Sequence, residues 1–189
     1  MTRRRFVVLD RDGTINVERH YIREPSQIQL LPRAAEGLRR LQKLGLGLVV
    51  ITNQSAVGRG LLTIEHLDLI HEQLTKLLQN EGVSLDGIYV CLHKPDDECP
   101  CRKPKPLLVN LASTELDFDP RSSFVIGDKP CDINLGRAVG GTTLLVRTGY
   151  GEQFTRDSAV VSDYQVDDLC HAAEVIEAVI ADQSVSKCN

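Results

Sequence analysis

Residues 6–14 read Phe-Val-Val-Leu-Asp-Arg-Asp-Gly-Thr, an apolar run that passes directly into two closely spaced aspartates and a glycine. The run at 6–9 predicts a short buried β-strand. Asp10 then falls at the carboxyl end of that strand, where ligands bind in open α/β sheets. Asp10 and Asp12 repel each other unless a cation or a shared proton intervenes. The pattern favours a divalent cation with one carboxylate free for nucleophilic or acid/base work, and a plain polar turn is the alternative.

Further apolar, β-branched runs predict four more strands, at about 46–51, 85–90, 123–126 and 143–146. Apolar residues at helical spacing predict helices over about 32–45, 63–81 and 106–115, another that begins near residue 132, and a last one over 166–180. The end of the chain, 184–189, is expected to fray. This alternation predicts an α/β fold with a Rossmann-like, doubly wound parallel sheet, in a single domain over 1–189.

The composition narrows the functional class. With 189 residues, of which 42% are hydrophobic and 25% charged, the chain can form a sizeable core without disulfides. Its net charge of -4 and the lack of a long basic tract argue against a nucleic-acid surface. No apolar run is long enough for a membrane span or a signal peptide. We therefore expect a cytoplasmic protein, a monomer, that acts on a small molecule.

Polar side chains follow the second predicted strand. Thr52, Asn53, Gln54 and Ser55 offer hydroxyl and amide donors that suit phosphate oxygens, and Arg59 adds a cation on a glycine-flanked turn. Because the carboxyl ends of parallel strands meet at one edge of a sheet, these groups are expected to lie near the aspartates of the first strand.

Two more clusters are expected at the same edge. A basic stretch at 102–105, which includes Arg102 and Lys103, follows the third strand, and Asp128 with Lys129 follows the fourth. The basic stretch suits anion binding, and added solubility is the alternative. Convergence of the clusters favours a single active site.

The polar loop at 16–25 is a candidate substrate-contacting flap because it follows the first strand directly. Its candidate residues are Glu18, Arg19, His20 and Tyr21, and a solvated loop is the alternative. By contrast, His66 and His71 lie on a predicted helix and are interpreted as surface or packing residues.

Three cysteines and a histidine fall within eleven positions after the third strand. Cys91, His93, Cys99 and Cys101 match the donor set of a closed tetrahedral zinc site, in a loop at about 91–101. With four protein ligands such a zinc would be structural, and redox-active or simply buried cysteines are the alternative. The other cysteines, at 131, 170 and 188, are interpreted as ordinary thiols.

Four short motifs share the order and residue types of a known phosphatase superfamily. They are Asp10-x-Asp12-Gly13-Thr14, then Thr52, then Lys103, and then Gly127-Asp128 with Asp132. Together they resemble the haloacid dehalogenase superfamily, over the chain to about Gly149. The resemblance implies a nearly capless Rossmann-like fold, catalytic Mg²⁺ and structural Zn²⁺.

The resemblance also implies roles. Asp10 resembles the nucleophile that forms an aspartyl-phosphate, and Asp12 the acid/base. The nearby Asp10 carboxylate and the bound phosphate would favour a proton on Asp12. Thr52 and Lys103 would steady the phosphoryl group. Mg²⁺ would be held by Asp10, the carbonyl of Asp12, and Asp128. Substrate recognition would fall to Glu18, Arg19, His20, Tyr21, Asn53, Gln54, Ser55, Arg59, Arg102 and Lys129.

Within the superfamily the motifs are most similar to the phosphatases of heptose bisphosphates, which implies removal of a sugar phosphate. The segment 97–105 also resembles histidinol-phosphate phosphatases, which remain an alternative for the substrate. A zinc-stabilised binding module without catalysis is the alternative from another class, and the presence of both Asp10 and Asp12 argues against it.

Overall fold

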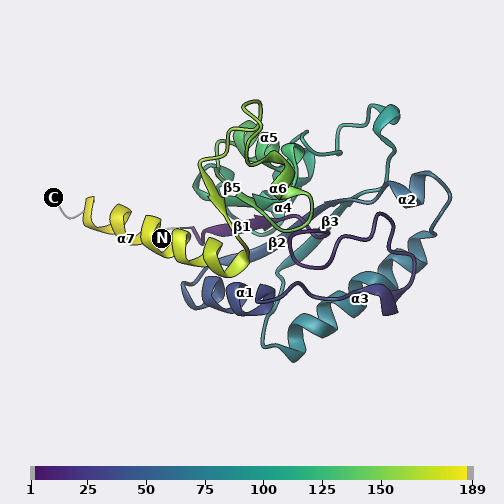
Figure 1. The fold of residues 1–189 in the computed structure, drawn as a ribbon, viewed down its shortest axis with the longest axis horizontal. Helices are drawn as coiled ribbons and strands as arrows, with labels where there is room; N and C mark the ends of the chain where they lie inside the picture. The colour runs from purple at the N-terminus through teal and green to yellow at the C-terminus, as the bar shows by residue number, and fades with distance from the viewer. Residues whose placement is uncertain (1–2, 187–189) are drawn as a thin grey trace.

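The computed structural model describes residues 3–186 and contains a parallel six-stranded sheet of order β3-β2-β1-β4-β5-β6 (Figure 1). The strands are β1 (Phe6–Leu9), β2 (Gly47–Asn53), β3 (Gly87–Cys91), β4 (Phe124–Gly127), β5 (Thr142–Val146) and β6 (Tyr164–Val166). The predicted α/β fold with a doubly wound parallel sheet is confirmed.

The central strand β1 is buried on both faces, as its unbroken apolar run predicts. Val7 and Leu9 point into one core cluster, whereas Phe6 and Val8 point into a second cluster on the opposite face. Because successive side chains of a strand alternate, this one short segment contributes to both halves of the core.

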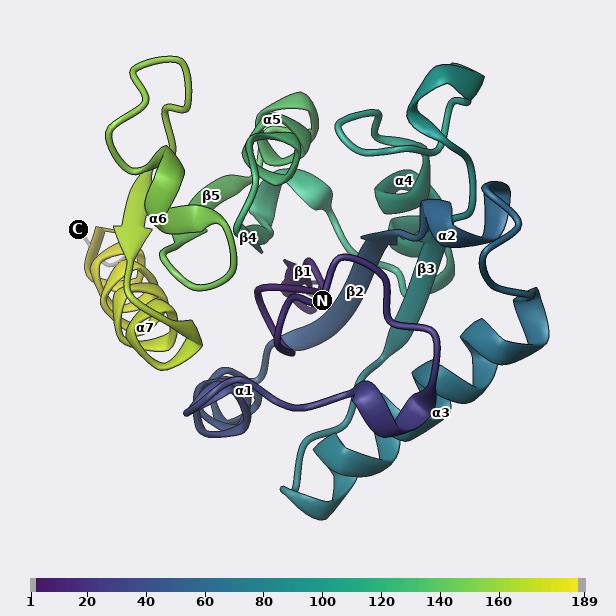
Figure 2. The same ribbon diagram turned by 45° about the vertical axis from the view of Figure 1, so that its right-hand side comes forward.

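Helices cover both faces of the sheet. The first core cluster packs α1 (Ala34–Lys43), α3 (Ile64–Asn80) and α7 (Leu169–Ser186) against the sheet. The second packs α4 (Leu107–Glu115) and α5 (Pro130–Val139) on the other face, and Figure 2 shows the two groups of helices on opposite sides of the strands. Short helices α2 (Ser55–Gly58) and α6 (Gly151–Phe154) and the 3-10 turns η1 (Pro25–Gln27), η2 (Pro95–Asp97) and η3 (Pro120–Ser122) lie in the connections.

Two parts of the sequence-based prediction are wrong. The sequence predicts a helix from residue 166, but Tyr164–Val166 pairs with β5 as a sixth strand and α7 begins at Leu169. Three residues are too short for a period of two to be recognised. In addition, the segment expected to fray from residue 184 is helical through Ser186, and residues 187–189 lie outside the described part of the chain.

The strand order determines where a ligand can bind. From β1 the chain proceeds outward through β2 to β3, and then crosses to β4 on the other side of β1. The connections at the carboxyl ends of β1 and β4 therefore diverge and leave a crevice between them, which is the usual ligand position in open α/β sheets. None of the helices in residues 3–186 is long and apolar enough to cross a membrane.

Candidate active site

A buried lysine joins two aspartates in this crevice. Nζ of Lys103 lies 2.7 Å from Oδ1 of Asp10, 2.7 Å from Oδ1 of Asp132 and 2.7 Å from the carbonyl oxygen of Ile51. Burial alone would lower the pKa of Lys103, but the Asp10 and Asp132 carboxylates outweigh burial and raise it. The ammonium therefore stays charged, next to the oxygen of Asp10 that faces it.

Three carboxylates form a group that could hold a divalent cation. Asp10, Asp128 and Asp132 each offer an oxygen, and these oxygens lie within 4.8 Å of one another. Oδ1 of Asp128 is buried and receives no hydrogen bond from any described residue, although Nζ of Lys129 is 3.8 Å away. Burial and the Asp10 carboxylate raise the pKa of Asp128 to about 8. A buried oxygen with no hydrogen-bond donor is what a Mg²⁺ ligand requires, so the residues fit the ion.

Two glycines allow the chain to approach Asp128 closely. Gly13 and Gly149 adopt left-handed backbone conformations, with φ of 84° and 58°, and a Cβ atom on either would collide with the Asp128 carboxylate. The glycine in the motif after β1 is therefore required both for the turn and for the space around Asp128.

Asp12 is held by hydrogen-bond donors on both carboxylate oxygens. Nη2 of Arg11 lies 2.8 Å from Oδ2, Nδ2 of Asn16 lies 2.8 Å from Oδ1, and Nε2 of Gln54 lies 2.8 Å from Oδ2. Burial raises the pKa of Asp12, but the charge and hydrogen bonds of Arg11, with those of Asn16 and Gln54, outweigh burial and lower it. These contacts favour the ionised form of Asp12. The protonated form expected from the sequence depends on a bound phosphate as well as on Asp10, so it stays a prediction.

The end of β2 contributes three adjacent side chains. Thr52 is buried, and its Oγ1 accepts a hydrogen bond from Nε2 of Gln54 at 2.8 Å. Asn53 forms a reciprocal pair with the backbone of Lys103: Oδ1 accepts from the Lys103 N–H at 3.1 Å, and Nδ2 donates to its carbonyl at 3.4 Å. Because of this pair, the loop that carries Lys103 is fixed to β2.

A pocket of about 180 Å³ opens over these groups. Its lining consists of Asp10, Asp12, Thr52, Asn53, Arg102, Lys103, Lys129 and Cys131. Apart from Cys131, all of these are residues that the sequence predicts for the site. A larger hollow lies along α3, but its charged residues, Asp68, Glu72 and Lys76, are exposed, whereas Asp10 and Lys103 are buried.

The predicted flap contacts the loops that follow β4 and β5. Oε2 of Glu18 lies 2.7 Å from Nζ of Lys129, which also lies 4.9 Å from the centre of the Tyr150 ring. The hydroxyl of Tyr150 is 3.2 Å from Nδ1 of His20. The flap is therefore joined to the rim of the pocket at two points. Seven of the predicted substrate contacts do not line this pocket: Glu18, Arg19, His20, Tyr21, Gln54, Ser55 and Arg59.

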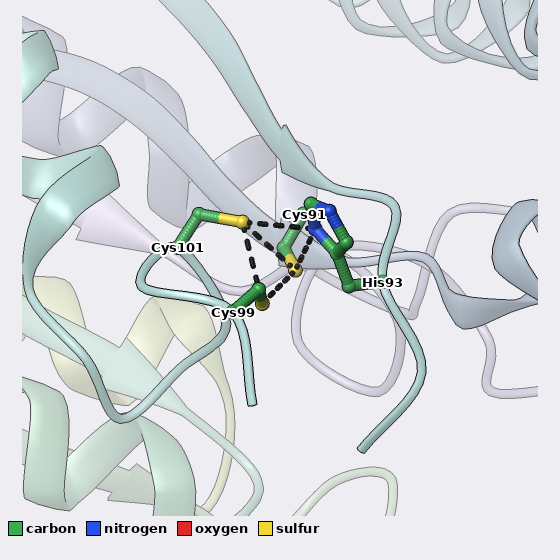
Figure 3. Close-up of side chains that lie close together, drawn as sticks. All are labelled: Cys91, His93, Cys99 and Cys101. Carbon is green, nitrogen blue, oxygen red and sulfur yellow. Dashed lines mark hydrogen bonds between the residues drawn. The ribbon is translucent and has the colours of Figure 1, made fainter. Parts of the chain in front are cut away.

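Three sulfur atoms and one ring nitrogen gather beyond β3 (Figure 3). Sγ of Cys91 is 3.6 Å from that of Cys99 and 3.3 Å from that of Cys101, and Nδ1 of His93 is 3.3 Å from the Cys101 sulfur. Burial and the neighbouring Cys101 raise the pKa of Cys91 to about 12. Separations of this size match the edges of a tetrahedral zinc site with bonds of roughly 2.0–2.3 Å. The cluster therefore fits a bound Zn²⁺, which would keep the thiols ionised.

Some residues of the site were missed or left without a role by sequence reasoning. Arg11 is 1% exposed, although an arginine between two aspartates would ordinarily be expected at the surface. Asp132 was noted only as part of a motif, yet it contacts Lys103. Its position four residues after Asp128, in the first turn of the next helix, was the available signal. Tyr150 and Cys131 carried no signal that sets them apart in the sequence.

Comparison with known proteins places this geometry in a family. Residues 100–172 match a family model described as HAD-hydrolase-like. The D-glycero-β-D-manno-heptose-1,7-bisphosphate 7-phosphatase of Yersinia pestis is 36% identical over 180 residues, which span 91% of this chain and 95% of that protein. The enzyme of the same name from Photorhabdus laumondii is 42% identical over 151 residues, 76% of this chain and 80% of that protein.

A solved structure agrees with these relatives. The crystal structure of D,D-heptose 1,7-bisphosphate phosphatase from B. bronchiseptica, in complex with magnesium and phosphate, superimposes with a TM-score of 0.86 at 30% identity. The match covers 92% of this chain and 98% of that one. The chain belongs to the D-glycero-β-D-manno-heptose-1,7-bisphosphate 7-phosphatase family of HAD-like hydrolases.

Proposed function

We propose that this protein is a Mg²⁺-dependent phosphatase that removes the C7 phosphate of D-glycero-D-manno-heptose 1,7-bisphosphate, in the biosynthesis of nucleotide-activated heptose. The observation that carries the proposal is the buried Asp10–Lys103 pair beside Asp128 in a pocket that also contains Asp12 and Thr52. The names of the relatives from Yersinia pestis and Photorhabdus laumondii support the substrate.

In the first step a carboxylate oxygen of Asp10 attacks the phosphorus atom, and the bond between phosphorus and the sugar oxygen breaks. The departing alkoxide takes a proton from Asp12. A bound phosphate dianion places negative charge beside Asp12, which opposes Arg11 and raises the pKa of the Asp12 carboxyl before the bond breaks. The product of this step is an aspartyl-phosphate on Asp10 and a free sugar hydroxyl.

In the second step Asp12 takes a proton from water, which attacks the aspartyl-phosphate and releases inorganic phosphate. Lys103 and the hydroxyl of Thr52 balance the charge of the phosphoryl oxygens in both steps. Asp10, the carbonyl of Asp12, and Asp128 would hold Mg²⁺, which offsets the repulsion between the carboxylates and the phosphate when it is bound.

Substrate recognition is assigned to charges at the rim of the pocket. Arg102 and Lys129 both line it and would bind the anionic and hydroxyl groups of the substrate. The flap residues Glu18 and His20, which contact Lys129 and Tyr150, would help to orient the sugar. Arg19, Tyr21, Ser55 and Arg59 would contact it only if the substrate extends beyond the pocket.

The cysteine and histidine cluster is assigned to a structural Zn²⁺. Arg102 donates a hydrogen bond to the carbonyl of His93 at 3.2 Å, and Nζ of Lys105 lies 2.7 Å from the carbonyl of Cys99. Residues next to the catalytic lysine thus contact the loop that carries the ligands. Zinc would fix the course of this loop and, through it, the direction of Arg102 and Lys103.

The decisive experiment measures phosphate release with Mg²⁺ from the heptose bisphosphate and from histidinol phosphate, side by side. We expect kcat/KM to be at least about tenfold higher for the heptose bisphosphate, because its second phosphate gives Arg102 and Lys129 an additional anionic group to bind. Asp10→Asn provides the inactive control, since it removes the nucleophile, and its melting temperature checks the fold. A preference for histidinol phosphate would refute the substrate, and full activity of Asp10→Asn would refute the mechanism.

A further inference from the structure

The side-chain amide of Gln54 bridges the two strand ends that carry the chemistry. Nε2 lies 2.8 Å from Oδ2 of Asp12 and 2.8 Å from Oγ1 of Thr52, and the residue is only 7% exposed. An amide nitrogen has two hydrogen atoms, so these two contacts use both of its donors. The carboxylate of Asp12 can only accept, which requires that the nitrogen, and not the oxygen, of the amide face it.

The backbone of Gln54 is fixed as well. Its N–H donates to the carbonyl of Cys91 at 2.7 Å, at the end of β3, and its carbonyl accepts from Val57 at 3.3 Å in the first turn of α2. The residue therefore links β3, β2 and the loop after β1. A residue whose backbone and side-chain amide are both hydrogen-bonded has little freedom to change its conformation when a substrate binds.

The contact with Thr52 has a directional effect. A hydroxyl group that accepts a hydrogen bond on one side directs its own hydrogen elsewhere. Because Oγ1 of Thr52 accepts from Gln54, the hydroxyl hydrogen is left to donate to an oxygen of a ligand in the pocket that Thr52 lines. The same amide orients the carboxylate of Asp12, so a single side chain controls both groups.

We propose that Gln54 is a positioning residue, which aims the Asp12 carboxylate and the Thr52 hydroxyl at the phosphoryl group, and that it is not a ligand of the sugar. This inference rests on the proposed function. It replaces the substrate-binding role that sequence resemblance implies for Gln54. A positioning residue acts on the transition state, so its loss lowers kcat, whereas loss of a sugar ligand that binds ground and transition states alike raises KM.

The test is Gln54→Met, which keeps the length and shape of the side chain but removes both donors. With the heptose bisphosphate and Mg²⁺ we expect kcat to fall about 10- to 100-fold, as for other partners that orient active-site groups, while KM changes less than about twofold. Gln79→Met makes the same chemical change at an exposed position on α3 and should leave both constants unchanged.

A second measurement distinguishes a loss of Asp12 orientation from a general loss of structure. In the single-turnover first step, p-nitrophenolate leaves without a proton, whereas a sugar alkoxide needs one from Asp12. Gln54→Met should therefore slow the step more for the sugar phosphate than for p-nitrophenyl phosphate. Gln54→Asn keeps the amide but shortens its reach, and it should give the same asymmetry if the methionine variant does not fold.

Three results would overturn the inference. An unchanged kcat with KM raised tenfold or more would make Gln54 a sugar ligand. Equal losses for the two leaving groups would mean that Gln54 does not aim Asp12. Wild-type protein that hydrolyses neither substrate would refute the proposed function together with this inference, whereas an active wild type with either of the first two results would refute the inference alone.

Discussion

Nζ of Lys103 lies 2.7 Å from Oδ1 of Asp132, the same distance that separates it from Oδ1 of Asp10. The other oxygen of Asp132 accepts the backbone N–H of Lys129 at 3.0 Å, so both of its oxygens are occupied. In the cluster of three carboxylates, Asp128 is therefore better suited to bind a cation, and Asp132 to hold the lysine.

Asp132→Asn tests this division. The variant weakens the ion pair that holds Lys103, so we expect kcat to fall about 10- to 100-fold, the usual effect of losing a partner that orients an active-site group. The Mg²⁺ concentration for half-maximal rate should change little. Steady-state kinetics at varied Mg²⁺ measure both quantities. A large rise in the Mg²⁺ requirement, with kcat recovered at saturation, would instead make Asp132 a cation ligand.

Asp12→Asn tests the acid role. The variant cannot donate a proton to the sugar alkoxide, so the single-turnover first step should slow about 10²- to 10⁴-fold for the heptose bisphosphate. It should slow far less for p-nitrophenyl phosphate, whose leaving group is stable as an anion. Rapid-quench measurement of aspartyl-phosphate gives the two rates. Equal losses would limit Asp12 to metal binding and positioning.

From the cysteine and histidine cluster we expect about one zinc per chain in protein purified without chelator, as measured by elemental analysis. Cys99→Ser should lose most of the zinc and much of the activity, because the loop no longer fixes Lys103 through the zinc ligands. Cys170→Ser, at a buried cysteine on α7 away from the cluster, is the matched control and should keep its zinc. Wild-type protein without zinc would contradict the assignment.

His71 predicts a dependence of stability on pH. Burial on α3, together with the nearby charge of Arg11, lowers the pKa of His71 from 6.5 to about 4. A lowered pKa means that the native state binds the proton less well than the unfolded state. The contribution of neutral His71 to the free energy of unfolding is therefore complete above pH 6.5 and is lost as the pH falls toward 4. Between pH 7 and pH 5 the loss is about 2 kcal/mol.

Urea unfolding of wild type and His71→Leu at the two pH values measures the contribution of His71 to the free energy of unfolding. The leucine variant should lose about 2 kcal/mol less stability than wild type between pH 7 and pH 5. His66→Gln, at an exposed histidine on the same helix, should follow wild type. If His71→Leu and wild type lost the same amount, the titration of His71 would not affect folding.

Much of the fold could be predicted from local patterns. The apolar run at 6–9 gave its strand, and the polar residues after it marked the carboxyl edge of the sheet. Thr52 and Lys103, some fifty residues apart in sequence, were expected to meet because parallel strands end together, and both line the pocket. The strand at 164–166 was missed because it forms only when β5 is present to pair with it.

The contacts within the site were less predictable. Gln54 and Asn53 look equivalent in sequence as polar residues after a strand, yet one bonds Asp12 and the other bonds the backbone of Lys103. Likewise, Glu18 pairs with Lys129, which lies 111 positions away. Which partner a polar side chain takes depends on how distant loops pack, and a single sequence contains no record of that packing.

The position of the cysteine and histidine cluster has a consequence for self-association of the protein. Cys91 is the last residue of β3. This strand lies at one edge of the sheet, and among the described strands it pairs with β2 alone. The outer edge of such a strand offers unpaired backbone groups to other chains. A metal ion held by Cys91, His93, Cys99 and Cys101 would fix the end of this strand and the loop that follows it. Depletion of the metal should thus appear first as intermolecular β-pairing, visible by light scattering, while the helices on both faces are still folded.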